Sequence, residues 1–266
     1  MSINNNFKNG IVIIGAGNVA THLSLSLKKN NFSISCIYSK TLHSAEKLAG
    51  KLNTDFTNDL DKIPKNADLY VLSIKDENIL SVVNNLNIEN GIVVHTAGSI
   101  SVDVFKNHFK DYGVFYPLQT FSKSRELDFS NIPICIEASN QDVKNKLFYL
   151  ANCLCKSVYK IDSEKRKVLH LAAVYASNFA NHMFAVAADI LDQADISFDL
   201  LKPLIKETVL KAIESDPQKA QTGPAVRNDQ NVIKNHLQML NDNQEFEKIY
   251  RFVSESIFKL NQEKNK

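Results

Sequence analysis

Short apolar runs recur at close intervals through the first 162 residues. They are rich in Ile, Val and Tyr, and several are apolar at almost every position, which is typical of parallel strands buried on both faces. The runs that predict strands are 11–15, 33–39, 69–74, 91–96, 113–118 and 132–138, and a run at 156–162 would close the sheet.

Helical patterns separate these runs. Helices are predicted to begin near Val19, Ser44, Asp76, Ser101 and Gln141. Strands that alternate with helices indicate a sheet that helices cover on both faces. Residues 1–162 therefore predict an α/β domain with a doubly wound, mostly parallel sheet.

The pattern changes after Asp162, because no later run has the character of a strand. Long helical stretches are predicted instead, at 163–193, 198–215, 229–241 and 243–260. The first is the most apolar, but polar residues between Ser177 and His182 interrupt it, which argues against contact with lipid. We therefore expect an all-helical second domain over residues 163–266 and no membrane association.

Two glycines follow the first apolar run. Gly15 would permit a tight turn, Gly17 would let an anion approach the backbone, and Ala20 would let the next helix pack close to the strand. Unpaired N–H groups at Asn18 and Val19 would face that anion. This spacing predicts a Rossmann-like fold that binds the diphosphate of a dinucleotide. A turn that uses glycine for geometry alone is the alternative.

The end of the second run bears on which dinucleotide binds. NAD-binding domains usually carry Asp or Glu here, to accept hydrogen bonds from the 2′-hydroxyl of the ribose. This chain has Ser39, Lys40 and Thr41, two hydroxyls and a cation that suit a 2′-phosphate. The residues favour NADP over NAD, although an exposed loop with an unrelated lysine gives the same pattern.

Further candidates follow three later runs, because the carboxyl ends of parallel strands line a binding crevice. The residues expected to contact the cofactor are Ser73, Ile74, Lys75, Thr96 and Gly98. His95 is a candidate for acid–base chemistry, and Tyr116 and Gln119 lie at the same rim. Helix caps at Asp76 and Ser101 are the alternative interpretation.

The long helix after Asp162 carries a polar stripe. At about 100° per residue, the side chains that share one face are Arg166, His170, Ser177 and Asn181, with Asn178 beside them. Polar groups on an apolar helix need partners, and a buried network or a dimer interface would provide them. The functional interpretation is that the stripe forms a wall of the crevice. His170 would then be the proton donor, and Asn181 would contact the substrate.

A turn-forming segment at 221–229 contains one more candidate. Arg227 follows Gly223 and Pro224 and could hold a substrate carboxylate in bidentate fashion. A surface salt bridge is the alternative. Asp229 is better explained as the N-cap of the next helix.

Composition narrows the class of protein. The chain has 266 residues, 44% of them hydrophobic and 23% charged, and its net charge of +2 lacks the basic excess of nucleic-acid-binding proteins. The polar N-terminus predicts no signal peptide. The four cysteines lack the spacing of a zinc site. We therefore expect a cytoplasmic protein with reduced thiols, no metal and no nucleic-acid partner.

Several segments together carry a resemblance. The glycine-rich turn and the segments YSK, HTAGS, YPLQTF, LHLAAVYASNFANHM and QTGPAVRND resemble a bacterial family assigned as NADP oxidoreductases. Its members have a Rossmann-like N-terminal domain and a helical C-terminal domain of unknown function. The resemblance covers nearly the whole chain. More distantly, the layout is similar to pyrroline-5-carboxylate reductase and the 6-phosphogluconate dehydrogenase superfamily.

The resemblance implies an NADP-dependent enzyme that transfers a hydride to or from a small, carboxylate-bearing carbonyl or imine substrate. It also implies a homodimer formed through the helical domain. In the better-known relatives a helix of that domain supplies catalytic groups, which implicates His170, Ser177 and Asn178. The relatives commonly use a lysine on this helix, so the acid–base assignment stays open. A regulatory protein that binds NADP(H) without turnover is the alternative.

Overall fold

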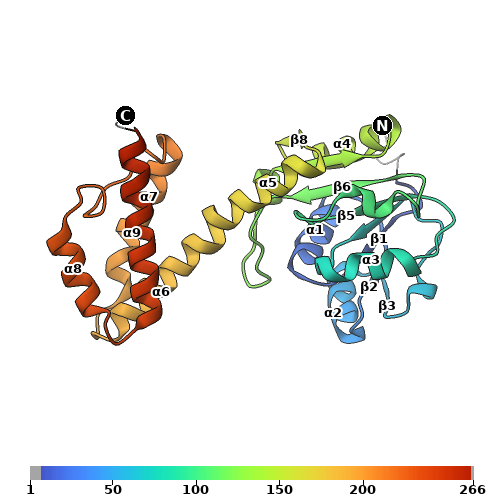
Figure 1. The fold of residues 1–266 in the computed structure, drawn as a ribbon. Coiled ribbons are helices and arrows are strands. Elements are labelled where there is room, and N and C mark those ends of the chain that lie inside the picture. Colours follow the sequence, from blue (N-terminus) through green and yellow to red (C-terminus); the bar gives the residue numbers. More distant parts are fainter. Residues whose placement is uncertain (1–6, 265–266) are drawn as a thin grey trace. The chain divides into compact units, whose positions relative to one another are not determined.

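The computed structural model describes residues 7–264. Its N-terminal part contains an eight-stranded sheet (Figure 1). The strands are β1 (Ile11–Ile14), β2 (Ile34–Tyr38), β3 (Asp55–Thr57), β4 (Leu69–Leu72), β5 (Ile92–His95), β6 (Tyr112–Pro117), β7 (Ile134–Ala138) and β8 (Val158–Lys160). They lie in the order β3-β2-β1-β4-β5-β6-β7-β8. Neighbouring strands are parallel except for the antiparallel pair β6–β7. The predicted α/β fold with a mostly parallel, Rossmann-like sheet is confirmed.

Each predicted run contains a strand, and the run at 156–162 does close the sheet as β8. The structure adds β3, which lies outside the predicted runs. This strand has three residues, two of them exposed, and forms the edge of the sheet beside β2. Because an exposed edge strand needs no continuous apolar run, the hydrophobic pattern does not reveal it.

Helices cover both faces of the sheet (Figure 1). On one face, Leu23 of α1 (Asn18–Lys29), Leu48 of α2 (Leu42–Leu52) and Leu147 of α4 (Gln141–Leu154) are buried in a shared cluster. On the other, Ile79 of α3 (Asp76–Asn85) packs in a cluster with Phe105. Phe105 belongs to a short 3₁₀ turn, Val102–Phe105, which stands where a longer helix is predicted to begin near Ser101.

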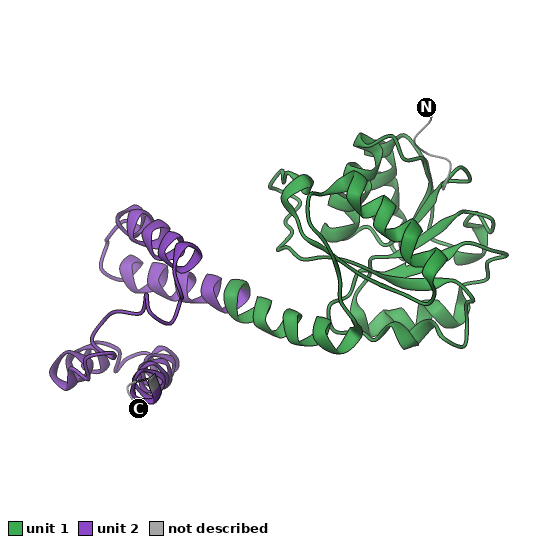
Figure 2. Cartoon of the chain, turned by 90° about the horizontal axis from the view of Figure 1, so that it is seen from above, with its two compact units in different colours: residues 1–177 green, residues 178–266 purple. Residues whose placement is uncertain are grey.

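The chain divides into two compact units after Ser177 (Figure 2). The second unit contains α6 (Ala180–Asp192), α7 (Lys202–Glu214), α8 (Gln230–Met239) and α9 (Gln244–Lys264). The sequence places the boundary earlier, after residue 162, where the last strand ends. The two boundaries differ because α5 (Ser163–Ala173), although helical, is attached to the sheet.

Arg166 makes this attachment. Its side chain is fully buried and donates to the carboxylate of Glu137 on β7 at 2.5 Å, and it also donates to the backbone carbonyl of Ile100. Ser163, the first residue of α5, donates to the same carboxylate at 2.7 Å and accepts from the N–H of Val102 at 2.9 Å. The start of α5 is therefore fixed to two segments of the first unit.

The predicted helix over 163–193 is continuous but not α-helical throughout. A π-helical segment, Val174–Phe179, joins α5 to α6. Hydrogen bonds in a π-helix run from residue i to i+5, so the spacing of 100° per residue does not hold across it. The regular α-helical spacing on which the prediction for Ser177, Asn178 and Asn181 rests is therefore interrupted here.

The second unit buries little of its own apolar surface. Among its described residues, Ala225 alone is buried, while Leu200, Leu204, Ile213, Met239 and Phe252 are each more than half exposed. None of the helices described here combines the length and the apolar character that crossing a membrane requires. The exposed apolar side chains of this unit therefore need another explanation.

Replacing Arg166 by Met should destabilise the protein by about 3–5 kcal/mol, because the substitution leaves the carboxylate of Glu137 without its charged partner. The matched control is Lys165→Met, next to it on the exposed side of α5, where the ion pair with Asp162 is solvated and contributes about 1 kcal/mol or less. Urea unfolding of both variants measures the difference. Equal losses in the two would contradict a special contribution from Arg166.

Candidate functional site

A cavity of about 920 Å³ opens at the carboxyl ends of β1, β4 and β5, within the first unit. The strand order reverses beside β1, which lies between β2 and β4. Ligands of open α/β sheets bind at such a reversal. The cavity falls within the volume range of about 300–1,000 Å³ that is usual for small-molecule sites.

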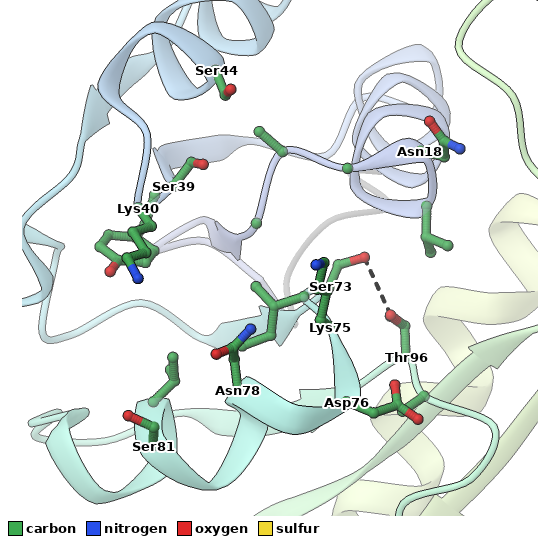
Figure 3. A pocket seen from close by; sticks show the side chains of 18 of the residues that line it. Asn18, Ser39, Lys40, Ser44, Ser73, Lys75, Asp76, Asn78, Ser81 and Thr96 are labelled. Atoms are coloured by element: carbon green, nitrogen blue, oxygen red, sulfur yellow. Dashed lines mark hydrogen bonds between the residues drawn. The ribbon is translucent and has the colours of Figure 1, made fainter.

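The cavity brings together nearly all of the residues predicted to contact a cofactor. Those that line it are Gly15, Gly17, Asn18, Val19, Ser39, Lys40, Ser73, Ile74, Lys75, Thr96 and Gly98. Thr41 does not line it and is instead the N-cap residue of α2. Figure 3 shows the side chains of several of these residues around the cavity.

The two glycines have different structural roles. Gly15 has a φ of +124°, and a Cβ there would lie 2.1 Å from the carbonyl oxygen of Ser73, so no other residue fits between β1 and β4. A Cβ at Gly17 would have no atom within 4 Å, so the space above it is open. Ala20, in the first turn of α1, is fully buried. The residues present therefore fit a diphosphate that contacts the backbone at Gly17.

The first turn of α1 completes this anion site. It contains no acidic side chain, and its leading N–H groups have no partner within a helix. The side-chain amide of Asn18 donates to the carbonyl of Phe121 at 2.8 Å, and the Lys123 ammonium donates to the carbonyl of Ala16 at 2.7 Å. The backbone N–H of Asn18 can therefore donate to an anion, while its side chain holds the loop that contains Phe121.

The end of β2 supplies hydroxyls and a cation. Ser39, Lys40 and Ser44 line the cavity there, and the first turn of α2 has no acidic residue. Among the described residues that line the cavity, the one carboxylate is Asp76, which begins α3 and accepts a hydrogen bond from Ser99. The β2 end of the cavity therefore has positive and neutral polar groups that suit a phosphate.

One wall of the cavity is not predicted from the sequence. It is formed by Asn78, Ser81, Val82 and Asn85 of α3, spaced i, i+3, i+4 and i+7, which is one face of a helix. The buried residues Ile79 and Val83 lie between them. The polar side of this amphipathic helix was a usable signal, but an exposed helix face gives the same pattern.

The ends of β4 and β5 meet at the floor of the cavity. The hydroxyl of Thr96 donates to that of Ser73 at 3.2 Å, as the dashed line in Figure 3 shows. Both hydroxyls are almost fully buried. This bond fixes two polar groups at the wall of the cavity.

His170 is the residue of the predicted stripe that lines the cavity, together with Tyr116 near the end of β6 and Gln119 just after that strand. Its Nδ1 lies 3.2 Å from the hydroxyl of Tyr116. A Cβ at Gly98 would lie 2.6 Å from the ring of His170, so the loop after β5 packs directly on the imidazole. His170 thus shares one cavity with the glycine turn.

The structure places His95 elsewhere. Its side chain is fully buried and its Nδ1 accepts from the N–H of Ala97 at 3.2 Å, with Phe105 packed against the ring. Burial, and then the charge of Arg166, lower the pKa of His95 to about 3. It does not line the cavity. A neutral imidazole in this position supports the loop and is poorly suited to donate a proton.

The other candidates of the helical region do not line the cavity either. Ser177, Asn178 and Asn181 lie within or after the π-helical segment, and Arg227 is exposed in the second unit. Asp229 does cap α8, where its carboxylate accepts from the N–H of Val232. Roles of the first four residues in catalysis or substrate binding stay predictions.

Two family models match the chain. Residues 10–99 match the model described as NADP oxidoreductase coenzyme F420-dependent, and residues 132–257 match a domain of unknown function, DUF2520. The first match spans β1 to β5, and the second spans β7, β8 and most of the helical region. No match is found among curated proteins.

Solved structures extend the likeness over the whole length. A Bacteroides fragilis protein assigned as an NADP oxidoreductase is 46% identical, with 97% of this chain and 100% of that chain covered and a TM-score of 0.92. An imine reductase from Myxococcus stipitatus, in complex with NADP⁺, is 15% identical over 96% of this chain and 93% of that one, with a TM-score of 0.67. A pyrroline-5-carboxylate reductase from Coxiella burnetii is 18% identical over 96% and 99%, with a TM-score of 0.58.

The two more distant structures show a shared fold. The Bacteroides relative shows more, because 46% of the residues are identical in an alignment that spans almost the whole of both chains. The protein therefore belongs to the NADP oxidoreductase family, a family of nicotinamide-dependent oxidoreductases in which a Rossmann-like domain precedes a helical domain of unknown function.

Proposed function

We propose that the protein transfers a hydride between NADP(H) and a small carbonyl or imine substrate that bears a carboxylate. The observation that carries this proposal is a single cavity that holds the glycine turn, the Ser39–Lys40 loop and the imidazole of His170. The Bacteroides relative and the NADP⁺-bound imine reductase support the choice of cofactor class. We also propose a cytoplasmic location. The four cysteines form no disulfide bonds with one another, which is compatible with the reducing conditions of that compartment.

Bound in this cavity, a nicotinamide ring would supply or accept the hydride. The protein's own groups would hold the rest of the cofactor. Backbone N–H groups from Gly17 onward would bind the diphosphate, and Ser39, Lys40 and Ser44 would bind the 2′-phosphate. His170 would donate a proton to the substrate atom on which negative charge develops.

The absence of a carboxylate at the β2 end of the cavity predicts selectivity for NADP. NADPH should bind at least about tenfold more tightly than NADH, a difference of about 1.4 kcal/mol. Lys40→Asp should erase or reverse this preference, because a carboxylate repels the 2′-phosphate and accepts from a 2′-hydroxyl. Calorimetric titration measures both affinities.

Lys47→Asp is the matched control, because it makes the same change of charge on α2 outside the cavity. It should leave the preference intact, apart from a small effect that salt screens. Equal affinities of the native protein for NADPH and NADH would overturn the assignment of NADP.

His170→Ala should lower turnover by about 10²–10⁴-fold, the usual contribution of a positioned general acid, and leave the affinity for NADPH nearly unchanged. The assay uses NADPH oxidation with a panel of small keto acids and cyclic imines. His108→Ala, at an exposed position outside the cavity, serves as the control. Unchanged turnover in His170→Ala would remove this residue from the mechanism.

The same panel separates the enzyme from the regulatory alternative. A protein that only senses NADP(H) would bind the dinucleotide and raise its unfolding temperature without oxidising NADPH in the presence of any substrate. An enzyme should in addition gain stability from a second, substrate-like ligand.

The exposed apolar surface of the helical region supports a homodimer as part of this proposal. Apolar side chains on α5 and α6, including Val168, Leu171, Met183 and Ile190, are between about one third and two thirds exposed. A helix that is apolar on most of its surface is normally buried. We therefore propose that a second copy covers the region 163–193 and the exposed side chains of the second unit.

Light scattering at micromolar concentration should accordingly give the mass of a dimer. Leu171→Glu should shift the protein toward the monomer, because a charge buried in an interface without a partner is costly. Lys167→Glu, on the same helix, is a control with an exposed and already charged residue. A monomer in the native protein would count against the proposed interface.

A further inference from the structure

The imidazole of His170 has a neighbour that the sequence prediction does not use for chemistry. The hydroxyl of Tyr116, at the end of β6, lies 3.2 Å from Nδ1 of His170. The two rings meet edge to face, with centroids 6.2 Å apart and planes at 80°. Both residues line the cavity. A buried phenol thus lies within hydrogen-bonding distance of the imidazole at the wall of the same cavity.

Two further contacts hold this pair in place. Gly98 lacks the Cβ that would collide with the ring of His170, so the loop after β5 can lie flat against the imidazole. One helical turn before His170, Arg166 ties α5 to Glu137 on β7. The loop after β5 therefore packs on the imidazole, and the ion pair of Arg166 holds the helix that carries it. Both contacts keep His170 close to Tyr116.

The surroundings favour the protonated phenol. Burial is the largest cause that raises the pKa of Tyr116, followed by Cys135 on β7, and Asp76 on α3 adds to the effect. The charge of Arg166 on α5 acts in the opposite direction. A hydroxyl that stays protonated can donate to Nδ1 when that nitrogen carries no proton. In that arrangement the ring proton of a neutral imidazole would reside on Nε2.

We propose that Tyr116 is the proton source behind His170: its hydroxyl donates to Nδ1, keeps the ring proton on Nε2, and replaces that proton when Nε2 delivers it to the substrate. The inference rests on the proposed function of His170 as proton donor and adds the residue that lets a neutral imidazole act as an acid. Tyr116 acts through His170, so it is a positioning residue and need not touch the substrate.

The proton balance of this step is complete. As the substrate carbon receives a hydride, its oxygen or nitrogen takes the proton from Nε2, and the phenolic proton moves to Nδ1. The imidazole ends neutral, and Tyr116 ends as a phenolate. The nearby guanidinium of Arg166 stabilises that phenolate, in the same sense as its effect on the pKa. Water returns the proton after the product leaves.

Nuclear magnetic resonance of protein labelled with ¹⁵N-histidine tests the contact without any substrate. The signals of His170 are identified by their loss in His170→Gln. At pH 8 we expect Nδ1 of His170 to be unprotonated and hydrogen-bonded, and Tyr116→Phe should move its resonance toward that of a free ring nitrogen. Tyr112→Phe, on the same strand and outside the cavity, should leave it unchanged. A proton on Nδ1, or no change in Tyr116→Phe, would overturn the proposal.

The pH dependence of turnover tests the relay itself, with pyruvate and 1-pyrroline-2-carboxylate as probes and NADPH as reductant. Without the phenol, the imidazole can act as an acid only when it carries an extra proton, which histidines lose between about pH 5 and 8. The ratio of native to Tyr116→Phe turnover should therefore rise from near one at about pH 5.5 to about 10²-fold at about pH 8.5. NADPH affinity should not change.

A ratio that stays constant with pH would contradict the relay, because a merely structural loss acts equally at every pH. If neither probe is reduced by the native protein, the proposed function is at fault. The resonance measurement then still decides whether Tyr116 sets the proton position on His170.

Discussion

The close approach of Gly15 to the end of β4 is the constraint on which the site depends. The carbonyl oxygen of Ser73 occupies the place where any side chain at position 15 would begin. β1 and β4 can therefore end side by side, and α1 can start immediately beyond them. That start leaves the space above Gly17 open. A larger residue at Gly15 would push the two strand ends apart and move the anion site away from Ser73 and Thr96.

A second constraint brings the imidazole of His170 to this site. The buried guanidinium of Arg166 holds α5 against β7 and the loop after β5, and His170 follows one turn later. The same interaction explains why the compact first unit extends beyond the last strand. The fold uses one buried ion pair to attach a helix, and the attached helix carries the imidazole to a cavity built from strand ends and the helices that follow them.

Sequence reasoning succeeds where a residue's role depends on local geometry. The glycine spacing predicts the turn at Gly15 and Gly17, and the hydrophobic runs predict the sheet, because both depend on short stretches of chain. It fails where the role depends on distant contacts. Arg166 and His170 share a predicted helix face, but only the fold shows that one meets Glu137 and the other meets Tyr116 and Gly98. The π-helical segment likewise interrupts the regular spacing from which Ser177 and Asn181 were predicted to lie beside them, and the roles of these two residues stay predictions.

In the orientation that we propose for NADP(H), the 2′-phosphate lies at the β2 end of the cavity, and the nicotinamide ring lies at the end lined by His170 of α5. A crystal structure of the protein with NADP⁺ tests this most directly. We expect the 2′-phosphate to lie within hydrogen-bonding distance of Lys40 and Ser44. The diphosphate should lie over Gly17, and the nicotinamide ring should lie beside His170. A dinucleotide bound in the reverse direction, or one whose nicotinamide lies away from His170, would contradict it.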